Sequence, residues 1–436
     1  MYYFIGIKGT GMASLALMLN DLGEEVCGSD LDKHFFTQDE LEKKNIKIFN
    51  FDPNNIKDNY TVIIGNAFLE DFPEVIAARN NPTCKCYRYH EFLGELMKNY
   101  ISLTVSGSHG KTTTTTMLKS VVSHFDKCGY LIGDGQGYLD KDSKYLCVEA
   151  DEFERHFISY YPSIAIITNI EIDHVDYFKD ENDYFDAYQE FVGHVKEAVF
   201  YYGDDAWCKK LKFNGVKAFS FGFEDNNDYV AKNIVTTNLH TNYDLYYKNE
   251  LIGHFDLPFI GKHLIIDSLG VIAEAHYLGY DLKEVNKVFE NNYEGPKRRY
   301  KIEEVNNTIF VDDYAHHPTE VKVTIEASKT RYPGRKVIAI FKPHRASRVK
   351  YFLEDFKNAL SLADQTYLLD FTSIDDTQDG TTISIHDLEK LIPNSKVISE
   401  DENGAKILSK YKGECLLFMS SKDIYNLANL TKEKMK

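Results

Sequence analysis

The residues best suited to chemistry form a glycine-rich run, Val105-Ser106-Gly107-Ser108-His109-Gly110-Lys111-Thr112, called the phosphate loop below. Its two glycines let backbone N–H groups turn inward around an anion, and a lysine next to them can reach terminal phosphates. The Thr112 hydroxyl can join the ligands of a Mg²⁺ ion. Val105 replaces the first glycine of the longer motif, so this is a shortened Gly-x-x-Gly-Lys-Thr form. A turn whose glycines only cap a helix is the alternative. The rest of the sequence favours binding of ATP or GTP.

Two acidic runs follow the phosphate loop, Glu149-Ala150-Asp151-Glu152 and the residues 168–176. Each lies at the end of a predicted strand, so both are expected at the carboxyl edge of a sheet, where open α/β folds bind ligands. Carboxylate oxygens suit Mg²⁺, and His174 can complete the shell of a second ion. A solvated acidic loop is the alternative for either run alone. Together with Lys111 and Thr112, they predict a two-cation phosphoryl-transfer site.

The final third of the chain carries two further candidate runs, residues 312–320 with adjacent histidines and residues 341–348 with a Pro-His-Arg sequence. Arg345 and Arg348 are three residues apart. If a helix begins here, they share one face and can hold a carboxylate by paired hydrogen bonds. The alternative is a basic helix start that faces solvent.

The N-terminal turn, Gly6-Ile7-Lys8-Gly9-Thr10-Gly11, precedes an apolar helix predicted over residues 12–22. Asp30 follows about twenty residues later, as in a dinucleotide-binding fingerprint. Lys8, however, occupies the position of the middle glycine. This turn therefore predicts a diphosphate site at a helix N-terminus rather than a nicotinamide dehydrogenase.

Strands that can position these runs recur along the whole chain, separated by helical patterns. They are predicted over residues 2–7, 25–28, 47–49, 61–64, 101–105, 145–149, 164–168, 308–312, 336–341, 366–369 and 415–419. Residues 217–255 alternate polar and aromatic side chains and are predicted to form a β insertion, before helices over 264–278 and 282–291. The fold class is therefore α/β with three domains, expected at 1–99, 100–294 and 295–436. The first and last are Rossmann-like, and the central one is a parallel-sheet domain with the phosphate loop.

Composition limits the class of protein. The chain has 436 residues, 43% of them hydrophobic, with a net charge of −17 and seven scattered cysteines. The negative charge argues against general nucleic-acid binding. No run of eighteen apolar residues and no signal sequence are apparent, so no membrane insertion is expected. A cytoplasmic protein with reduced thiols follows, and its oligomeric state stays open.

Seven motifs in order resemble the Mur ligases: Gly-x-x-Gly-x-Gly-Met, Gly-Ser-His-Gly-Lys-Thr, Glu-Ala-Asp-Glu, Thr-Asn-Ile-Glu-x-Asp-His-x-Asp, Lys-Arg-Arg, Asp-Asp-Tyr-Ala-His-His-Pro-Thr-Glu and Pro-His-Arg-x-Ser-Arg. The resemblance covers essentially the whole chain. It implies ATP- and Mg²⁺-dependent ligation of L-alanine to UDP-N-acetylmuramate through an acyl phosphate, in the synthesis of peptidoglycan precursors. A ligase that recycles muramyl tripeptide, and a nucleotide-binding relative with impaired catalysis, are the alternatives.

The resemblance also implies roles for individual residues. Lys111, His174, His344, Arg345 and Arg348 would be catalytic, with Thr112 and Glu149 at the first Mg²⁺ and His174 at the second. ATP would contact Gly107, Ser108, His109, Gly110, Lys111, Thr112, Thr113, Asn169, His263, Asp267, Arg298, Arg299 and Asp312. The other substrates would contact Gly9, Thr10, Gly11, Met12, Asp30, Asn66, Arg155, His156, Tyr314, His316, His344, Arg345 and Arg348.

Three segments depart from the family pattern. The adenine segment keeps His263 but has Leu264 and Asp267 in place of asparagines, and a C-terminal Gly-Ala-Gly loop appears as residues 420–422, Ser-Ser-Lys. Lys342 stands where family members commonly have glutamine. Its charge is expected to act on the choice of amino acid.

Overall fold

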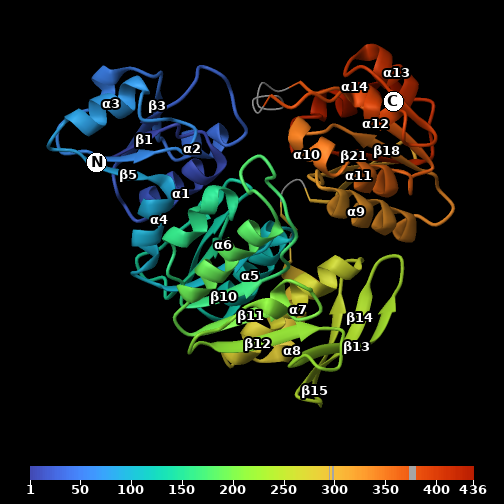
Figure 1. Cartoon of the computed structure of the whole chain (residues 1–436), viewed down its shortest axis with the longest axis horizontal. Helices are drawn as coiled ribbons and strands as arrows, with labels where there is room; N and C mark the ends of the chain where they lie inside the picture. Colours follow the sequence, from blue (N-terminus) through green and yellow to red (C-terminus); the bar gives the residue numbers. More distant parts are fainter. Residues whose placement is uncertain (294, 297–298, 373–379) are drawn as a thin grey trace.

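The computed structural model describes residues 1–293, 295–296, 299–372 and 380–436. Three sheets follow one another along the chain, and each belongs to its own lobe in Figure 1. This confirms the three-part α/β fold. Arg298, a predicted ATP contact, lies outside the described residues.

The N-terminal sheet has the strand order β3-β2-β1-β4-β5, and all its pairs are parallel. Its strands are β1 (Tyr2–Ile5), β2 (Val26–Ser29), β3 (Lys47–Phe49), β4 (Thr61–Ile64) and β5 (Lys85–Arg88). The helices are α1 (Thr10–Asp21), α2 (Gln38–Lys43), α3 (Pro73–Asn80) and α4 (Tyr89–Met97). Strands β1 and β4 are almost wholly buried, as expected for a parallel sheet covered on both faces. Helix α1 starts at the carboxyl end of β1, so its N-terminus faces the edge where ligands bind.

The central sheet has ten strands in the order β15-β14-β13-β12-β11-β10-β6-β9-β7-β8. The predicted β insertion continues this sheet: β13 pairs with β12 in parallel, and β14 and β15 follow antiparallel. The strands are β6 (Ile101–Ser106), β7 (Cys128–Ile132), β8 (Gln136–Tyr138), β9 (Tyr145–Glu149), β10 (Ile164–Ile167), β11 (Ala198–Tyr202), β12 (Lys217–Gly222), β13 (Tyr229–Thr236), β14 (Thr241–Tyr247) and β15 (Glu250–Leu257). The helices are α5 (Lys111–Phe125), α6 (Glu181–Gly193), α7 (Lys262–Tyr277) and α8 (Leu282–Asn292).

The C-terminal sheet has the order β16-β17-β21-β18-β19-β20, with only the edge strand β16 antiparallel. Its strands are β16 (Lys301–Val305), β17 (Thr308–Asp313), β18 (Val337–Phe341), β19 (Gln365–Leu368), β20 (Ser395–Val397) and β21 (Cys415–Met419). The helices are α9 (Pro318–Arg331), α10 (Ala346–Tyr351), α11 (Leu353–Leu360), α12 (Ile385–Glu389), α13 (Glu402–Leu408) and α14 (Tyr425–Met435).

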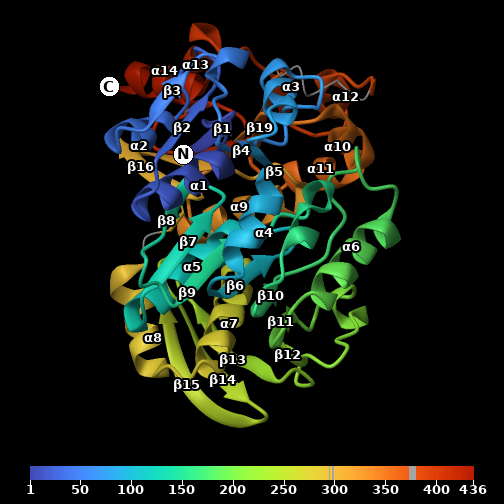
Figure 2. The same cartoon turned by 90° about the vertical axis from the view of Figure 1, so that its left-hand side faces the viewer.

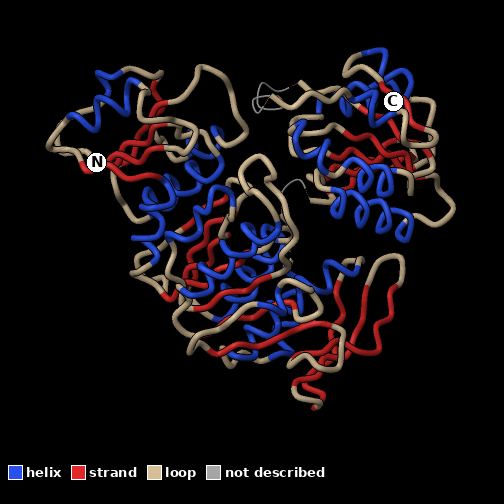
Figure 3. The backbone as a smooth tube through the Cα atoms, viewed as in Figure 1, coloured by secondary structure: helices blue, strands red, loops and turns tan. Residues whose placement is uncertain are grey.

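The two Rossmann-like domains stand on the same side of the central domain, away from its β13–β15 end (Figures 1 and 2). Helix α1 packs on strands β7 and β8 of the central domain. Figure 3 shows that loops, rather than helices or strands, make up much of the chain where the three domains face one another. Among the described residues, no helix is both long enough and apolar enough to cross a membrane.

Candidate active site

A cleft of about 1220 Å³ is lined by residues of all three domains. Its wall includes the phosphate loop, the start of helix α1 and the end of strand β17. The sequence-predicted residues that line it are Thr10, Gly11, Asn66, Ser108, His109, Gly110, Lys111, Thr112, Glu149, His156, His174, Arg299, Asp312, Tyr314 and His316. Residues from all three predicted domains therefore meet at one place.

The other described candidates lie outside this lining. They are Gly9, Met12, Asp30, Gly107, Thr113, Arg155, Asn169, His263, Asp267, His344, Arg345 and Arg348. Some support the lining: the Asn169 side chain accepts a hydrogen bond from the His109 backbone N–H at 3.0 Å. Arg155 points elsewhere, because it pairs with Asp183 at 2.7 Å.

The phosphate loop connects strand β6 to helix α5, and its two glycines are required where they stand. Gly107 and Gly110 have φ angles of 146° and 81°, which favour glycine. A Cβ atom at Gly107 would lie 2.0 Å from the Thr168 hydroxyl, and one at Gly110 would lie 2.5 Å from an Asp267 oxygen. Only a glycine-containing loop fits between these neighbours, so the backbone can close around an anion at the start of α5.

Lys111 is the cation of this loop. Its ammonium donates to the Gly107 carbonyl at 2.7 Å and pairs with the fully buried Glu152 at 2.7 Å. Burial alone would lower the pKa of Lys111. The nearby carboxylates of Glu152, Asp151 and Glu149 outweigh burial and hold that pKa above its usual value. Lys111 is therefore charged and held at the cleft.

Thr112 and Glu149 lie together beside the loop. The Thr112 hydroxyl donates to Glu149 Oε1 at 2.9 Å, and the Gly133 backbone N–H donates to Glu149 Oε2 at 2.7 Å. Burial raises the pKa of Glu149, although these donors and Lys111 oppose the shift. A hydroxyl and a carboxylate at the cleft wall are the oxygen donors that Mg²⁺ prefers.

His174 lies close to two carboxylates, those of Asp151 and Glu152. The ligand atoms of Asp151, Glu152 and His174 all lie within 4.8 Å of one another. Burial lowers the pKa of His174 to about 4, so its ring is neutral and carries a lone pair. Its Nδ1 atom is buried and makes no hydrogen bond with the described residues. This cluster can hold a second divalent cation.

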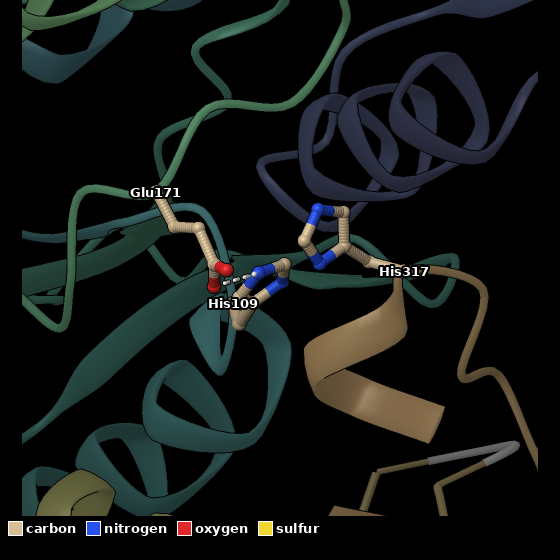
Figure 4. Close-up of side chains that lie close together, drawn as sticks. All are labelled: His109, Glu171 and His317. Carbon is tan, nitrogen blue, oxygen red and sulfur yellow. Dashed lines mark hydrogen bonds and ion pairs between the residues drawn. The ribbon is translucent and has the colours of Figure 1, made fainter. Parts of the chain in front are cut away.

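His109 connects the phosphate loop to the C-terminal domain (Figure 4). Its Nε2 lies 3.1 Å from Glu171, its Nδ1 lies 3.5 Å from Glu320, and its ring centre lies 4.5 Å from that of His317. Burial would lower the pKa of His109, but hydrogen bonds to both glutamates raise it to about 10. The ring is thus a cation between two domains. It could bind a metal ion only after losing that firmly held proton.

The two arginines of the Pro-His-Arg run do not share a helix face. Helix α10 begins at Ala346, and Arg345 precedes it with a φ of 65°. Arg345 pairs with Asp176, while Arg348 is buried and donates to Asp173 at 2.8 Å. Each guanidinium is therefore held by a different aspartate of the central domain, and a joint hold of both arginines on one carboxylate stays a prediction.

Other candidates lie in the lining of the cleft or beside it. Asn66 and His156, from different domains, lie 3.2 Å apart between side-chain nitrogens. His344 Nδ1 lies 3.0 Å from the Ser421 hydroxyl. Burial, together with Lys422 and Arg348, lowers the pKa of His344 to about 2, so that ring is neutral.

Sequence reasoning missed several partners of these residues. They are Glu152, Glu171, Asp173, Asp176, His317 and Glu320. Each lies within one of the motif runs, so the signal was present. The runs gave no indication of which acid would pair with which base across two domains.

Three α/β domains around one cleft, with a charged lysine and several carboxylates at a phosphate loop, define an enzyme of nucleotide-dependent phosphoryl transfer. Family comparisons agree with this class. Residues 1–101 match "Mur ligase family, catalytic domain", residues 105–275 match "Mur ligase middle domain" and residues 298–421 match "Mur ligase, glutamate ligase domain". The chain belongs to the Mur ligase family, whose members are ATP-dependent ligases.

Individual relatives span nearly the whole chain. The UDP-N-acetylmuramate--L-alanine ligase of Lacticaseibacillus paracasei is 42% identical over 97% of this chain and 96% of its own length. A solved UDP-N-acetylmuramate-alanine ligase from Thermotoga maritima superposes with a TM-score of 0.82 at 25% identity, over 99% of this chain and 98% of its own. A murein peptide ligase from Psychrobacter arcticus shares the fold, with a TM-score of 0.72 at 21% identity over 100% of this chain and 98% of its own.

Proposed function

We propose that this enzyme joins L-alanine to UDP-N-acetylmuramate, with ATP converted to ADP and phosphate. One observation carries the proposal: a single cleft brings Lys111 and Thr112 of the phosphate loop together with Thr10 and Gly11 of the N-terminal domain and with Tyr314 of the C-terminal domain. Three substrates need such a shared cleft. The 42% identical relative that spans 97% of this chain carries the name of this activity.

The reaction has two displacements. The muramate carboxylate attacks the γ-phosphorus of ATP, ADP leaves, and the acyl phosphate forms. The neutral amine of alanine then attacks the acyl carbon, the C–O bond to the phosphate breaks, and the leaving phosphate takes up the proton that the amine loses. Lys111 and the N–H groups of the phosphate loop offset the charge on the phosphate oxygens, which is the main contribution a protein makes to phosphoryl transfer.

For the metal ions, the donors present fit Mg²⁺. We assign Thr112 and Glu149 to one ion, because their oxygens already lie 2.9 Å apart at the cleft. His174, with Asp151 and Glu152, is assigned to the other. When bound, Mg²⁺ supplies positive charge that stabilises the phosphate oxygens. The remaining work, positioning the nucleotide and excluding water, falls to the loop and the C-terminal domain.

Arg345 is the proposed anchor of the alanine carboxylate. It is partly exposed and must release Asp176 to bind it, whereas Arg348 is buried against Asp173 and stabilises the domain contact. Replacing Arg345 by glutamine should raise the KM for alanine about ten- to a hundredfold, the value of one charge-assisted contact. Lys350→Gln, on helix α10 directly after Arg345, is the control. If Arg345→Gln weakened UDP-N-acetylmuramate binding instead, the anchor would belong to the other substrate.

We also propose a cytoplasmic location. The seven cysteines are all free, as expected for a reducing compartment. Fractionation of cells that express a tagged full-length chain tests this directly, and recovery in the membrane fraction would contradict it.

A phosphate-release assay tests the whole assignment. The enzyme is given ATP, Mg²⁺ and UDP-N-acetylmuramate with a panel of single amino acids and the tripeptide. L-alanine should give the fastest release, with formation of the ligated product. Preference for the tripeptide would assign the recycling reaction, and no release with any acceptor would assign an inactive nucleotide-binding relative.

A further inference from the structure

Lys8 is the residue that breaks the glycine pattern of the N-terminal turn, and its side chain has a defined place. It is only 7% exposed, and its ammonium donates to the carbonyls of Leu31 at 2.8 Å and Lys33 at 2.9 Å. Gly6 in the same turn has a φ of 84°, but Lys8 has no left-handed backbone. A side chain is therefore tolerated at this position without strain, and it turns toward a neighbouring segment.

That segment, residues 30–37, is fixed to Lys8 through backbone groups as well. The Lys8 N–H donates to the Asp30 carboxylate at 2.7 Å, and the Thr37 hydroxyl donates to the Lys8 carbonyl at 2.5 Å. Residues 31–37 form neither helix nor strand, so no ladder of backbone hydrogen bonds orders them. Lys8 therefore makes hydrogen bonds to both ends of the segment, at Asp30 and Thr37, and to Lys33 between them.

The same segment forms one wall of the cleft. Lys33, His34, Phe35 and Phe36 line it, together with Thr10 and Gly11 of the N-terminal turn. Phe36 is 51% exposed, although it packs near Gly135 of the central domain. The neighbouring Phe35 ring has the Lys33 ammonium 5.7 Å from its centre, so this wall offers aromatic faces and a positive charge. A nucleotide base and its phosphates can use both.

We propose that Lys8 is a positioning residue for the nucleotide part of UDP-N-acetylmuramate: its ammonium orders residues 31–37 so that their side chains meet the bound nucleotide. This rests on the proposed function. Direct contact of Lys8 with the diphosphate is the competing reading. The geometry disfavours that reading, because the ammonium is bonded to two carbonyls and Lys8 does not line the cleft.

The test compares Lys8→Met, which keeps the length of the side chain and removes its donors, with the wild-type enzyme. Lys44→Met is the control, since Lys44 lies in the same domain and pairs with Asp21 at the surface. UDP is the binding probe, and amide hydrogen exchange reports the order of residues 31–37 without any substrate. We expect Lys8→Met to weaken UDP binding and raise the KM for UDP-N-acetylmuramate about tenfold, with kcat and the KM for ATP and alanine within about twofold.

In the same variant, exchange of the amides in residues 31–37 should become at least about tenfold faster, while the melting temperature stays close to that of Lys44→Met. Faster exchange with unchanged UDP affinity would overturn the proposal, because Lys8 would then be merely structural. Weaker UDP binding with unchanged exchange would also overturn it, in favour of direct contact. UDP binding is measured without catalysis, so a wild-type protein that binds UDP and ligates nothing would refute only the proposed function.

Discussion

The chain contains two glycine turns that connect a strand to a helix, the N-terminal turn and the phosphate loop. Their lysines differ in whether the ammonium group lies at the cleft. In the N-terminal turn, the Lys8 ammonium meets two backbone carbonyls and stays out of the cleft. In the phosphate loop, the Lys111 ammonium lines the cleft and meets the buried carboxylate of Glu152. Each turn is followed by the N-terminus of a helix, which favours phosphate groups, but only the phosphate loop adds the charge of its lysine to the cleft.

This difference fits two different tasks, binding of a group that does not react and stabilisation of a group that does. A turn that holds a diphosphate needs dipoles and shape, because the group does not change during the reaction. A turn that handles a γ-phosphate needs charge that becomes more useful in the transition state. The acids around Lys111 keep it protonated and in place at the cleft, where the proposed reaction needs a positive charge.

The largest expected effect is at Lys111. We expect Lys111→Met to lower kcat about 100- to 1000-fold, the loss typical for a group that stabilises transition-state charge. Lys119→Met, on the same helix, should keep nearly normal activity. Circular dichroism and phosphate release from both variants provide the measurement. A folded Lys111→Met enzyme within tenfold of the wild-type kcat would remove the distinction between the two turns.

A change at Glu149 tests whether the phosphate loop, unlike the N-terminal turn, also lies beside a metal ion. Glu149→Gln keeps the size of the side chain and one acceptor oxygen, but removes the charge and one of the two oxygens that accept from Thr112 and Gly133. The Mg²⁺ concentration for half-maximal activity should rise at least about tenfold, the scale found for groups that support a metal. The exposed Glu224→Gln serves as control. An unchanged Mg²⁺ requirement would place the first metal elsewhere.

Asp267, which lies against Gly110 of the phosphate loop, gives a pH-dependent test. Burial raises its pKa from the usual 3.8 to about 8, so the folded chain binds a proton that the unfolded chain has lost. This stabilises the fold fully at low pH, and the contribution is lost as pH rises toward 8. Asp267→Asn has no such loss. The melting temperature of Asp267→Asn, measured relative to wild type, should therefore rise between pH 5 and pH 8. The expected rise is about 2–4 °C for each kcal/mol of unfolding free energy that the wild type loses over this range.

The control for this experiment is the exposed Asp186→Asn in the same domain, which should show no such trend. A difference between Asp267→Asn and wild type that stays constant from pH 5 to pH 8 would mean that Asp267 is ionised in the folded protein. In that case it would add negative charge beside the phosphate loop, which disfavours a nucleotide.

The sequence predicted the elements of both turns well, because hydrophobic periodicity and glycine position are local signals. The strand 145–149, the phosphate loop and the order of the sheets all followed from them. What it could not predict is pairing over long distances. Arg348 with Asp173, and His109 with Glu320, join residues 175 and 211 positions apart, in different domains. The helix start at Ala346 also escaped, since Arg345 takes a left-handed conformation that its own type does not favour.

The smallest expected effect is at Lys342, a buried lysine that resembles Lys8 rather than Lys111. From the sequence, its charge was expected near the amino acid. The structure instead pairs its ammonium with Glu400 at 2.7 Å and with the Asp423 carbonyl at 2.8 Å, and Lys342 does not line the cleft.

Because Glu400 neutralises the charge of Lys342, that lysine attracts a distant alanine carboxylate only weakly. Glu400 is partly exposed, so it tolerates the loss of its partner. Lys342→Gln keeps an N–H donor on this side chain and removes only a charge that lies outside the cleft, so the KM for alanine should stay within about twofold of wild type. Steady-state kinetics across several amino acids measures this. A change of about tenfold or more in the KM for alanine, or a new preferred amino acid, would contradict this expectation. It would show that a lysine can act on a substrate without lining the cleft. Lys8 and Lys111 would then differ only in their distance from the substrate.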